Sequence, residues 1–336
     1  MSGKRVKKSS GKKKLKRISI NLALFFMMQI LIGLAFSIPM VYYGPFSNIK
    51  DVVVTTAMTT FSHQYLATFF LNNNEINQIM EKYAVHDEDQ SSNLNEVSVT
   101  DGDVQKSDDQ VQLVNISTDK VKGYIILVKN PAMVKTVSAD KIGVKGMKLL
   151  DMVKENNAIG GINAGGFEDE GGHGSGGVPL GLLMTDGEVI YGNQKEKYQI
   201  IGFNEDHQLV LGRYTIQEAK QNKIKDAVSF GPFLVVNGQG MIKSNTTVPG
   251  SLQPRTAIGQ RKDGTIIMLV IDGRQISSLG ASLKDVQDIM LQYEAYNAAN
   301  LDGGSSATMA YQGAVINNPC GPSGPRYLPS AFLITK

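Results

Sequence analysis

The chain of 336 residues contains a single cysteine, Cys320, so no disulfide bond can form within it. A domain that stands outside the cytoplasm without disulfides is more typical of a bacterial surface protein than of a eukaryotic secreted one. Histidine is also scarce. The four His residues, at positions 63, 86, 173 and 207, show no HExxH or comparable ligand spacing, so the sequence carries no zinc-hydrolase motif.

Acidic side chains are absent from residues 1–17, which carry nine of the 34 Lys and Arg residues. The rest of the chain therefore has 25 basic against 31 acidic side chains, a net charge of −6. Because the positive total comes from the tail alone, the composition does not indicate a nucleic-acid-binding fold. The basic tail is typical of a segment that sets membrane topology and contacts anionic lipid.

Charged residues are missing altogether from residues 18–38. A helix of this length is about 31 Å long, enough to cross the hydrocarbon core of a membrane. The run is longer than the apolar part of a signal peptide and no small-residue cleavage site follows it, so we expect a single-pass anchor over residues 18–43 in the cell membrane. The positive-inside rule then places residues 1–17 in the cytoplasm and the chain after Tyr43 outside. A cleaved signal peptide is the alternative.

The remaining chain falls into three parts by composition. Residues 51–85 have apolar and aromatic positions at helical spacing, which predicts a helical stalk next to the membrane. Residues 86–110 hold eight acids and one Lys, the composition of a solvated linker. A compact domain is expected over residues 111–336.

Two apolar runs in this domain, residues 265–271 and 298–301, each end in an Asp followed by Gly. Between them, apolar residues recur at helical spacing, and Ser282 with Asp285 forms the pattern of a capping box. A strand, helix and strand in this order favour parallel neighbours in one sheet, whose carboxyl ends meet at one edge. We therefore expect Asp272 and Asp302 to lie side by side with Arg274, although Asp-Gly is also ordinary turn chemistry.

A third polar residue, Asn163, follows a predicted strand over residues 158–162 and is a candidate for the same edge. After it, residues 168–177 form a Gly-rich loop with Glu168, Asp169 and His173 as further candidates. The loop matches G-x-G-x-x-G formally, but no strand precedes it and no helix follows, which excludes a dinucleotide site. Residues 228–237 predict one buried strand with a rigid bend at Gly231-Pro232.

The ordered motifs of the domain resemble those of the phosphodiester glycosidase family. They are INAGGF (162–167), GLLMTDGEVI (181–190), FGPFLVVNG (230–238), RTAIG (255–259), IDGRQ (271–275), NLDGGSSATM (300–309) and the final Gly-Pro-Arg (324–326). The resemblance implies a mixed α+β domain, with helices packed on a β-sheet. It also implies hydrolysis of the bond between a sugar anomeric carbon and a phosphodiester oxygen.

The resemblance implies a role for each of the candidate site residues. Asp302 or Asp272 would stabilise the developing sugar cation, as nucleophile or as base for water. Paired N–H donors of Arg255, Arg274 or Arg326 would bind the phosphodiester. The other expected substrate contacts are Asn163, Glu168, Gly303, Gly304, Ser305 and Ser306. A divalent cation held by Asp and Asn oxygens stays an open alternative, and no other cofactor is expected. GGSSA is not a nucleophile elbow, which argues against a serine hydrolase.

The sequence thus predicts a membrane-anchored hydrolase outside the cytoplasm, acting on a phosphate-bearing glycan of the cell wall or an exopolysaccharide. A phosphoglycan-binding scaffold without turnover is the alternative, because a stalk and linker suit a positioning role equally well. A phosphodiesterase that cuts P–O instead of C–O is the third hypothesis.

The expected topology can be tested independently of any activity. If residues 18–38 are an uncleaved anchor, protease added to intact protoplasts should remove the chain beyond Tyr43 and leave a small basic fragment in the membrane, as seen by immunoblot against an N-terminal tag. A mature protein that starts after residue 38 would show a signal peptide instead.

Overall fold

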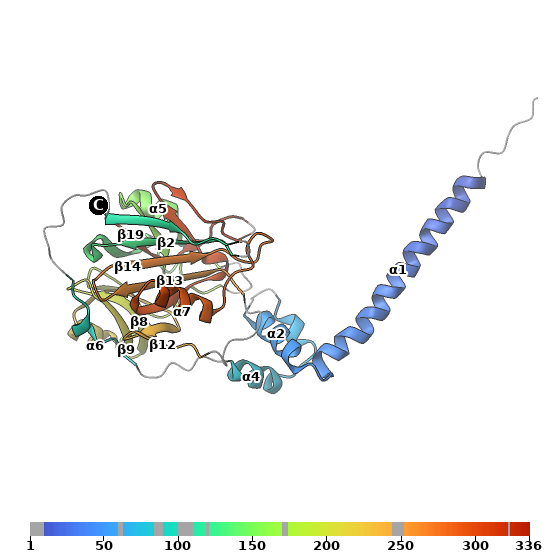
Figure 1. Ribbon diagram of the computed structural model, residues 1–336, viewed down its shortest axis with the longest axis horizontal. Coiled ribbons are helices and arrows are strands. Elements are labelled where there is room, and N and C mark those ends of the chain that lie inside the picture. Colours follow the sequence, from blue (N-terminus) through green and yellow to red (C-terminus); the bar gives the residue numbers. More distant parts are fainter. Residues whose placement is uncertain are drawn as a thin grey trace, which may run out of the picture.

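The computed structural model describes residues 10–59, 63–83, 90–99, 110–118, 121–169, 174–243, 252–321 and 323–336, with the backbone alone for residues 10–19. Most of the predicted basic tail, and the candidate His173, lie outside these ranges. A long first helix extends away from a β-rich domain, and a small cluster of helices lies between the two (Figure 1).

The first helix, α1 (Ser10–Tyr43), contains a segment, Ile20–Tyr43, that is long and apolar enough to cross a membrane. None of its most apolar window is buried against the rest of the protein, as expected for a surface made for lipid. A signal sequence would have the same length and composition, so the helix by itself does not fix the topology.

The predicted stalk over residues 51–85 is not one rod but three short helices, α2 (Ser47–Met58), α3 (Tyr65–Thr68) and α4 (Asn73–Lys82). A capping box between Asn72 and Glu75 starts α4 as a separate helix. The three helices pack on one another and on the end of α1 through Tyr42, Val54, Ala57, Ala67, Leu71, Ile76 and Ile79. We call α2, α3, α4 and the last turn of α1 the helical cluster.

Part of the predicted linker is docked on the domain, although several of its side chains stay exposed. Residues 90–99, the docked segment, contain a short 3-10 helix, η1 (Leu94–Glu96), and bury Val97. The amide of Ser92 donates to the carbonyl of Leu211, and the amide of Ser98 to that of Lys262. The composition suggested solvation because it is acidic, whereas the backbone groups of this segment find partners on the strands.

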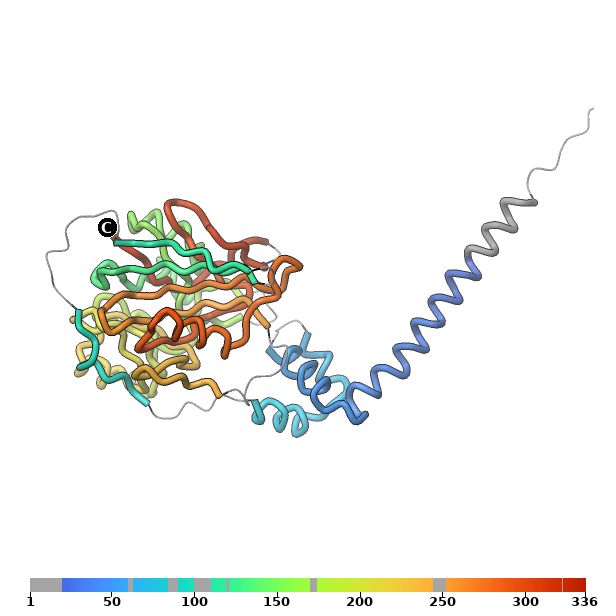
Figure 2. Tube along the Cα trace, viewed as in Figure 1, coloured from blue at the N-terminus to red at the C-terminus, as the bar shows by residue number. Residues whose placement is uncertain are grey.

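The tube along the Cα trace shows the β-rich domain set apart from the extended first helix (Figure 2). This domain contains three main antiparallel sheets. The first is seven-stranded, in the order β1 (Val111–Asn115), β2 (Gly123–Val128), β14 (Ile266–Ile271), β13 (Arg255–Arg261), β15 (Ala295–Leu301), β11 (Phe233–Val236) and β12 (Gln239–Gly240). The second contains β7 (Glu188–Tyr191), β6 (Leu183–Thr185), β10 (Ile224–Ser229), β8 (Lys197–Asn204) and β9 (Leu209–Thr215). The third contains β17 (Ala314–Val315), β16 (Met309–Tyr311), β5 (Gly160–Asn163), β19 (Ser330–Ile334) and β3 (Val134–Ser138), and β4 (Met147–Lys148) pairs with β18 (Tyr327–Leu328).

One hydrophobic core joins the inner faces of the three sheets, with Phe203 of β8 packed edge-on against Phe332 of β19. The outer faces are covered by helices α5 (Leu149–Glu155), α6 (Ile216–Gln221) and α7 (Leu283–Gln292). Both faces of β14 are therefore buried, which explains its unbroken apolar sequence IIMLVI. The predicted α+β class is confirmed, as is the capping box that starts α7 at Ser282.

The structure corrects the predicted pairing of the two strands that end in Asp-Gly. Strands β14 and β15 run in the same direction, but β13 lies between them and is antiparallel to both. The carboxyl ends of β14 and β15 therefore do share an edge, as expected, and the first residue of β13, Arg255, lies between them. Strand order depends on long-range pairing, which local patterns do not determine.

The predicted strand over residues 228–237 is also two strands. The cis Gly231–Pro232 bond separates β10 in the second sheet from β11 in the first. The apolar run was continuous in sequence because both strands are buried.

Candidate active site at the carboxyl ends of two strands

Three candidate residues meet at one edge of the seven-stranded sheet. Asp272 follows β14, Asp302 follows β15, and Arg255 begins the strand between them. The turn after Asp302 crosses this edge, since the amide of Gly304 donates to the carbonyl of Pro254. A Cβ at Gly303 would lie 2.8 Å from that carbonyl oxygen, and Gly304 has a φ of +58° beside the Arg274 guanidinium. Both positions therefore favour glycine.

Asn163, the last residue of β5, lies fully buried beneath this edge. Its Oδ1 accepts from the hydroxyl of Thr256 at 2.8 Å and from the amide of Thr308 at 3.0 Å. Its Nδ2 donates to the carbonyl oxygen of Asp302 at 2.6 Å. Asn163 is thus placed to position the turn that carries Asp302, and not to contact a substrate directly.

The carboxyl group of Asp302 is enclosed by protein on most sides. Burial raises its pKa to about 7, and the neighbouring carboxylate of Asp169 adds to this. The hydroxyl of Ser306 and the cation of Arg326 act in the opposite direction, because both favour the ionised form. The group therefore titrates near neutral pH, as catalytic acids and bases often do.

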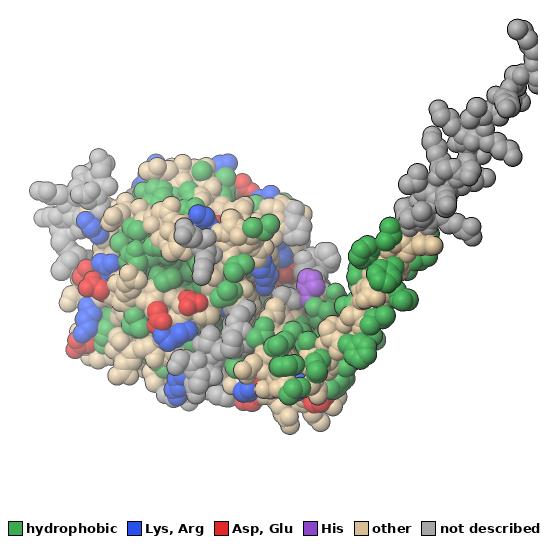
Figure 3. All heavy atoms as spheres, turned by 45° about the vertical axis from the view of Figure 1, so that its right-hand side comes forward, with side chains coloured by type: hydrophobic (Ala, Val, Ile, Leu, Met, Phe, Trp, Pro, Cys, Tyr) green, Lys and Arg blue, Asp and Glu red, His purple; other side chains and the backbone are tan. Residues whose placement is uncertain are grey.

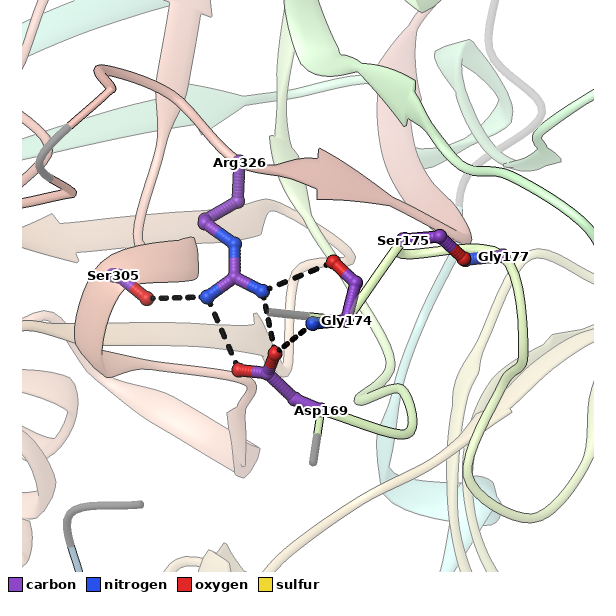
Figure 4. Close-up of polar contacts among 6 residues, drawn as sticks. All are labelled: Asp169, Gly174, Ser175, Gly177, Ser305 and Arg326. Atoms are coloured by element: carbon purple, nitrogen blue, oxygen red, sulfur yellow. Dashed lines mark hydrogen bonds and ion pairs between the residues drawn. The ribbon is translucent and has the colours of Figure 1, made fainter. Parts of the chain in front are cut away.

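Arg326 is held by a two-pronged ion pair with Asp169 from the Gly-rich loop (Figure 4). The distances are 2.7 Å from Nη2 to Oδ1 and 3.1 Å from Nη1 to Oδ2. Nη1 also donates to the hydroxyl of Ser305, Nη2 to the carbonyl of Gly174, and the amide of Gly174 to Asp169. The side chains of Arg326 and Asp169 are only 16% and 11% exposed. The guanidinium group of Arg326 is therefore mostly occupied by contacts within the protein.

Arg255 and Arg274 both border the Gly303-Gly304 turn and lie close enough for their charges to interact. Burial, together with the nearby Arg274 cation, lowers the pKa of Arg255 to about 10, which still leaves it charged at neutral pH. Its Nε donates to the carbonyl of Ala281, and the described residues offer its terminal nitrogens no acceptor. Two adjacent cations are suited to binding an anion.

Asp272 occupies a different environment from Asp302. It is 4% exposed, and Oδ1 accepts from the Asn317 side chain at 2.9 Å and from the Asn318 amide at 3.0 Å. Burial raises its pKa, and these two hydrogen bonds oppose the rise. Its carboxylate thus fastens the loop after β17 to the end of β14, which leaves it poorly placed to meet a substrate. No motif in the sequence indicates Asn317 and Asn318 as its partners.

Glu168 is exposed and lies on the rim of an open pocket of about 560 Å³. The other lining residues come mainly from β7, β8 and the turn between them, including Tyr191, Asn193 and Glu196. Glu168 is therefore next to the Asp169 ion pair in sequence, but its side chain faces a separate hollow from the two arginines.

For a divalent cation, the described residues contain no group of three or more His, Cys, Asp or Glu side chains that could hold one. The oxygens of Asn163 and Asp272 that were expected to serve as ligands already accept hydrogen bonds from the protein.

An α+β domain with a carboxylate and two arginines at one sheet edge is a candidate for binding an anionic substrate. The family model described as phosphodiester glycosidase matches residues 156–335, which is more than half of the chain. The chain therefore belongs to the phosphodiester glycosidase family.

Curated relatives agree with this assignment. The SPbeta prophage-derived uncharacterized protein YomE of Bacillus subtilis (strain 168) is 31% identical over 183 residues, 51% of this chain and 27% of that protein. The N-acetylglucosamine-1-phosphodiester alpha-N-acetylglucosaminidase of Mus musculus is 27% identical over 156 residues, 42% of this chain and 30% of the enzyme. The match thus spans less than a third of the length of these relatives.

Among solved structures, the catalytic domain of zebrafish N-acetylglucosamine-1-phosphodiester alpha-N-acetylglucosaminidase, auto-inhibited by its pro-peptide, is similar with a TM-score of 0.55. It is 23% identical, and the similarity covers 67% of this chain and 82% of that one. At this identity the comparison supports the fold.

The raised pKa of Asp302 predicts a pH-dependent effect of its replacement. The folded protein holds this proton up to about pH 7, whereas an unfolded chain releases it near pH 4, so the wild type should lose stability as pH rises between these values. Asp302→Asn cannot ionise. Its thermal midpoint relative to wild type should therefore increase from pH 5 to pH 8, measured by calorimetry.

The exposed Asp140→Asn is the matched control and should show no such trend. A difference between Asp302→Asn and wild type that stays constant over this range would show that Asp302 is already ionised at pH 5.

Proposed function

We propose that the chain hydrolyses the bond between a sugar anomeric carbon and a phosphodiester oxygen, with Asp302 as the catalytic carboxylate. The observation that carries the proposal is the buried Asp302 carboxyl group beside Arg326 and Asp169, on a glycine turn that borders Arg255 and Arg274. Membership of the phosphodiester glycosidase family supports the reaction class, and the names of the mammalian relatives support a sugar-1-phosphodiester substrate.

Arg255 and Arg274 bind the phosphodiester in this proposal. Their mutual repulsion is relieved by an anion, and the planar guanidinium groups donate paired N–H bonds to phosphate oxygens. Arg326 acts differently from the other two, because its donors are taken up by Asp169, Ser305 and Gly174. It holds the Gly-rich loop and favours the ionised form of Asp302.

The ionised Asp302 stabilises the positive charge that develops at the anomeric carbon as the C–O bond breaks, either as nucleophile or as base for water. The bond electrons leave with the phosphate monoester, which is a better leaving group than a sugar alkoxide and needs less help from a general acid. Ser306 donates to the carboxylate and orients it, while Asn163 fixes the carbonyl of the same residue. Asp272 positions the neighbouring loop and takes no chemical part.

The setting of the reaction also belongs to the proposal. The N-terminal helix, with the basic segment before it, supports an anchor whose N-terminus is cytoplasmic and whose domain lies outside. The substrate in that compartment would be a phosphate-bearing glycan of the cell wall or an exopolysaccharide.

Asp302→Asn tests the central assignment. It keeps the shape of the side chain but removes the charge, and loss of an essential carboxylate commonly raises the barrier by several kcal/mol, where about 1.4 kcal/mol is tenfold in rate. We expect turnover of a nitrophenyl-phosphoryl sugar to fall at least about a hundredfold. Ser306→Ala should lower it less, because the carboxylate remains.

Three further outcomes decide between the hypotheses. Near wild-type turnover in folded Asp302→Asn would refute the assignment. Hydrolysis in ¹⁸O-labelled water should place the label in the sugar, whereas label in the phosphate would indicate cleavage of the P–O bond. A protein that binds the isolated polymer in a pulldown but releases no sugar would be a scaffold.

The arginine pair gives a separate prediction on binding. Arg274→Gln removes one charged donor, and hydrogen bonds to charged groups contribute about 1.5–3 kcal/mol, so KM should rise about tenfold to a hundredfold. The exposed Arg213→Gln on β9 is the matched control and should leave KM unchanged. An unchanged KM in Arg274→Gln would contradict the proposed phosphate site.

A further inference from the structure

The helical cluster has large apolar side chains on its outside as well as in its core. Phe69 is 80% exposed, and Tyr43, Phe46, Ile49, Tyr65 and Leu66 are also exposed. In the space-filling view, apolar side chains, with other groups among them, extend from the visible part of α1 onto this cluster (Figure 3). A folded helical unit in water would not favour so many exposed aromatic groups so close together.

The exposed aromatic residues are fixed to the end of α1. The ring of Tyr42 stacks on Phe70 at 4.5 Å, and the rings of Phe69 and Phe70 meet edge-on at 5.1 Å. The hydroxyls of Tyr42 and Tyr43 donate to the carbonyls of Leu66 and Phe70. Gly44 allows the sharp exit from α1, since a Cβ there would lie 2.3 Å from the carbonyl oxygen of Met40.

Tyrosine and phenylalanine next to the end of an apolar span have the placement of an interfacial aromatic belt. Asp51 joins two helices inside the helical cluster. It is 3% exposed and accepts from Lys82 at 2.7 Å and from Tyr83 at 2.8 Å, which joins α2 to α4. The cluster therefore forms a fixed base on α1, whose outer aromatic groups are adjacent to the apolar span.

The arginine side of the site is attached to this base. The side chain of Gln253 donates to the hydroxyl of Thr59 at the end of α2 and accepts from Arg274. Gln253 also exchanges both backbone hydrogen bonds with Ala281 and so holds the loop between β14 and α7. In Figure 1 this edge of the domain points toward the side on which α1 runs.

That loop has its own exposed apolar side chains. Ile276 is fully exposed and Leu279 is 55% exposed, on either side of the buried Ser278 that bonds the carbonyl of Asp272. Apolar groups at the tip of a loop beside two arginines match the chemistry of a lipid interface, where acyl chains lie below anionic headgroups.

We propose that the helical cluster and the loop carrying Arg274 and Ile276 form one membrane-facing surface, which holds the arginine side of the site against the lipid interface. The proposal that this surface faces the membrane does not depend on the proposed reaction. Its consequence for the substrate rests on the proposed function: the site takes glycosyl phosphodiesters that are attached to the membrane, such as sugars linked through phosphate to a lipid.

The chain contains no tryptophan, so a single introduced Trp reports on its own position. Phe69→Trp and Ile276→Trp are placed in the full chain in nanodiscs whose phospholipids are brominated in the acyl chains, a quencher that acts at short range. Tyr293→Trp, at the opposite end of α7 from Ser282, is the matched control. Circular dichroism confirms that each variant is folded.

Emission from positions 69 and 276 should be about twofold weaker in brominated than in ordinary nanodiscs, whereas emission from position 293 should not change. Quenching at 69 without quenching at 276 would overturn the inclusion of the loop. Unquenched emission at 69 would overturn the whole surface.

Comparing turnover of a lipid-linked and a soluble substrate tests whether the site takes substrates attached to the membrane. The double variant Phe69→Ser and Ile276→Ser should raise KM several-fold for a glycosyl phosphodiester on a lipid in vesicles, and should leave turnover of the soluble nitrophenyl-phosphoryl sugar unchanged. Equal effects on both substrates would overturn this consequence. Absence of turnover with either substrate in the wild type would contradict the proposed function, while the quenching result would still decide the surface.

Discussion

The buried side-chain amide of Asn163 joins segments that are far apart in sequence: Thr256 at the start of β13, Thr308 before β16, and the carbonyl of Asp302 after β15. The first and third sheets meet at this amide. A buried polar group must have its partners or lose free energy, so each of these segments is held in one place by the same residue. The orientation of the Asp302 carboxylate depends on this contact, because it fixes the backbone to which the side chain is attached.

The charges of the site are arranged for a ligand as much as for the fold. Arg326 and Asp169 neutralise each other with little exposure to water, and both act on the charge of Asp302. Arg255 and Arg274 are left close together, and Asp302 is left in surroundings that resist its ionisation. Such features oppose folding, and their concentration at one edge is typical of a binding or catalytic site.

The local parts of this structure could be predicted from the sequence, and the long-range parts could not. The capping box at Ser282, the apolar β14 and the turn at Asp302 each depend on residues within a few positions. The insertion of β13 between β14 and β15, by contrast, depends on pairing across the whole sheet. Arg326 and Asp169 are 157 residues apart, and no pattern in either segment indicates the other.

The remaining differences between prediction and structure concern which residues are exposed to water. The docked segment was predicted to be a linker because its side chains are polar. Its backbone amides, however, donate hydrogen bonds to β9 and to the turn after β13. The apolar and aromatic positions of the predicted stalk are only partly buried, since Tyr65, Leu66 and Phe69 around α3 are exposed. Burial depends on which surfaces meet, and composition alone does not specify this.

The docked segment also has a mechanical consequence. Between the helical cluster and β1, residues 90–99 bond to β9 of the second sheet and to the turn after β13, at the end of that strand opposite the site. A pull along α1 would thus be carried to the domain by two routes, the hydrogen bonds of residues 90–99 and the contact between Thr59 and Gln253. The second route ends at Arg274, so tension on the N-terminal helix would reach the arginine side of the site before it reached β1.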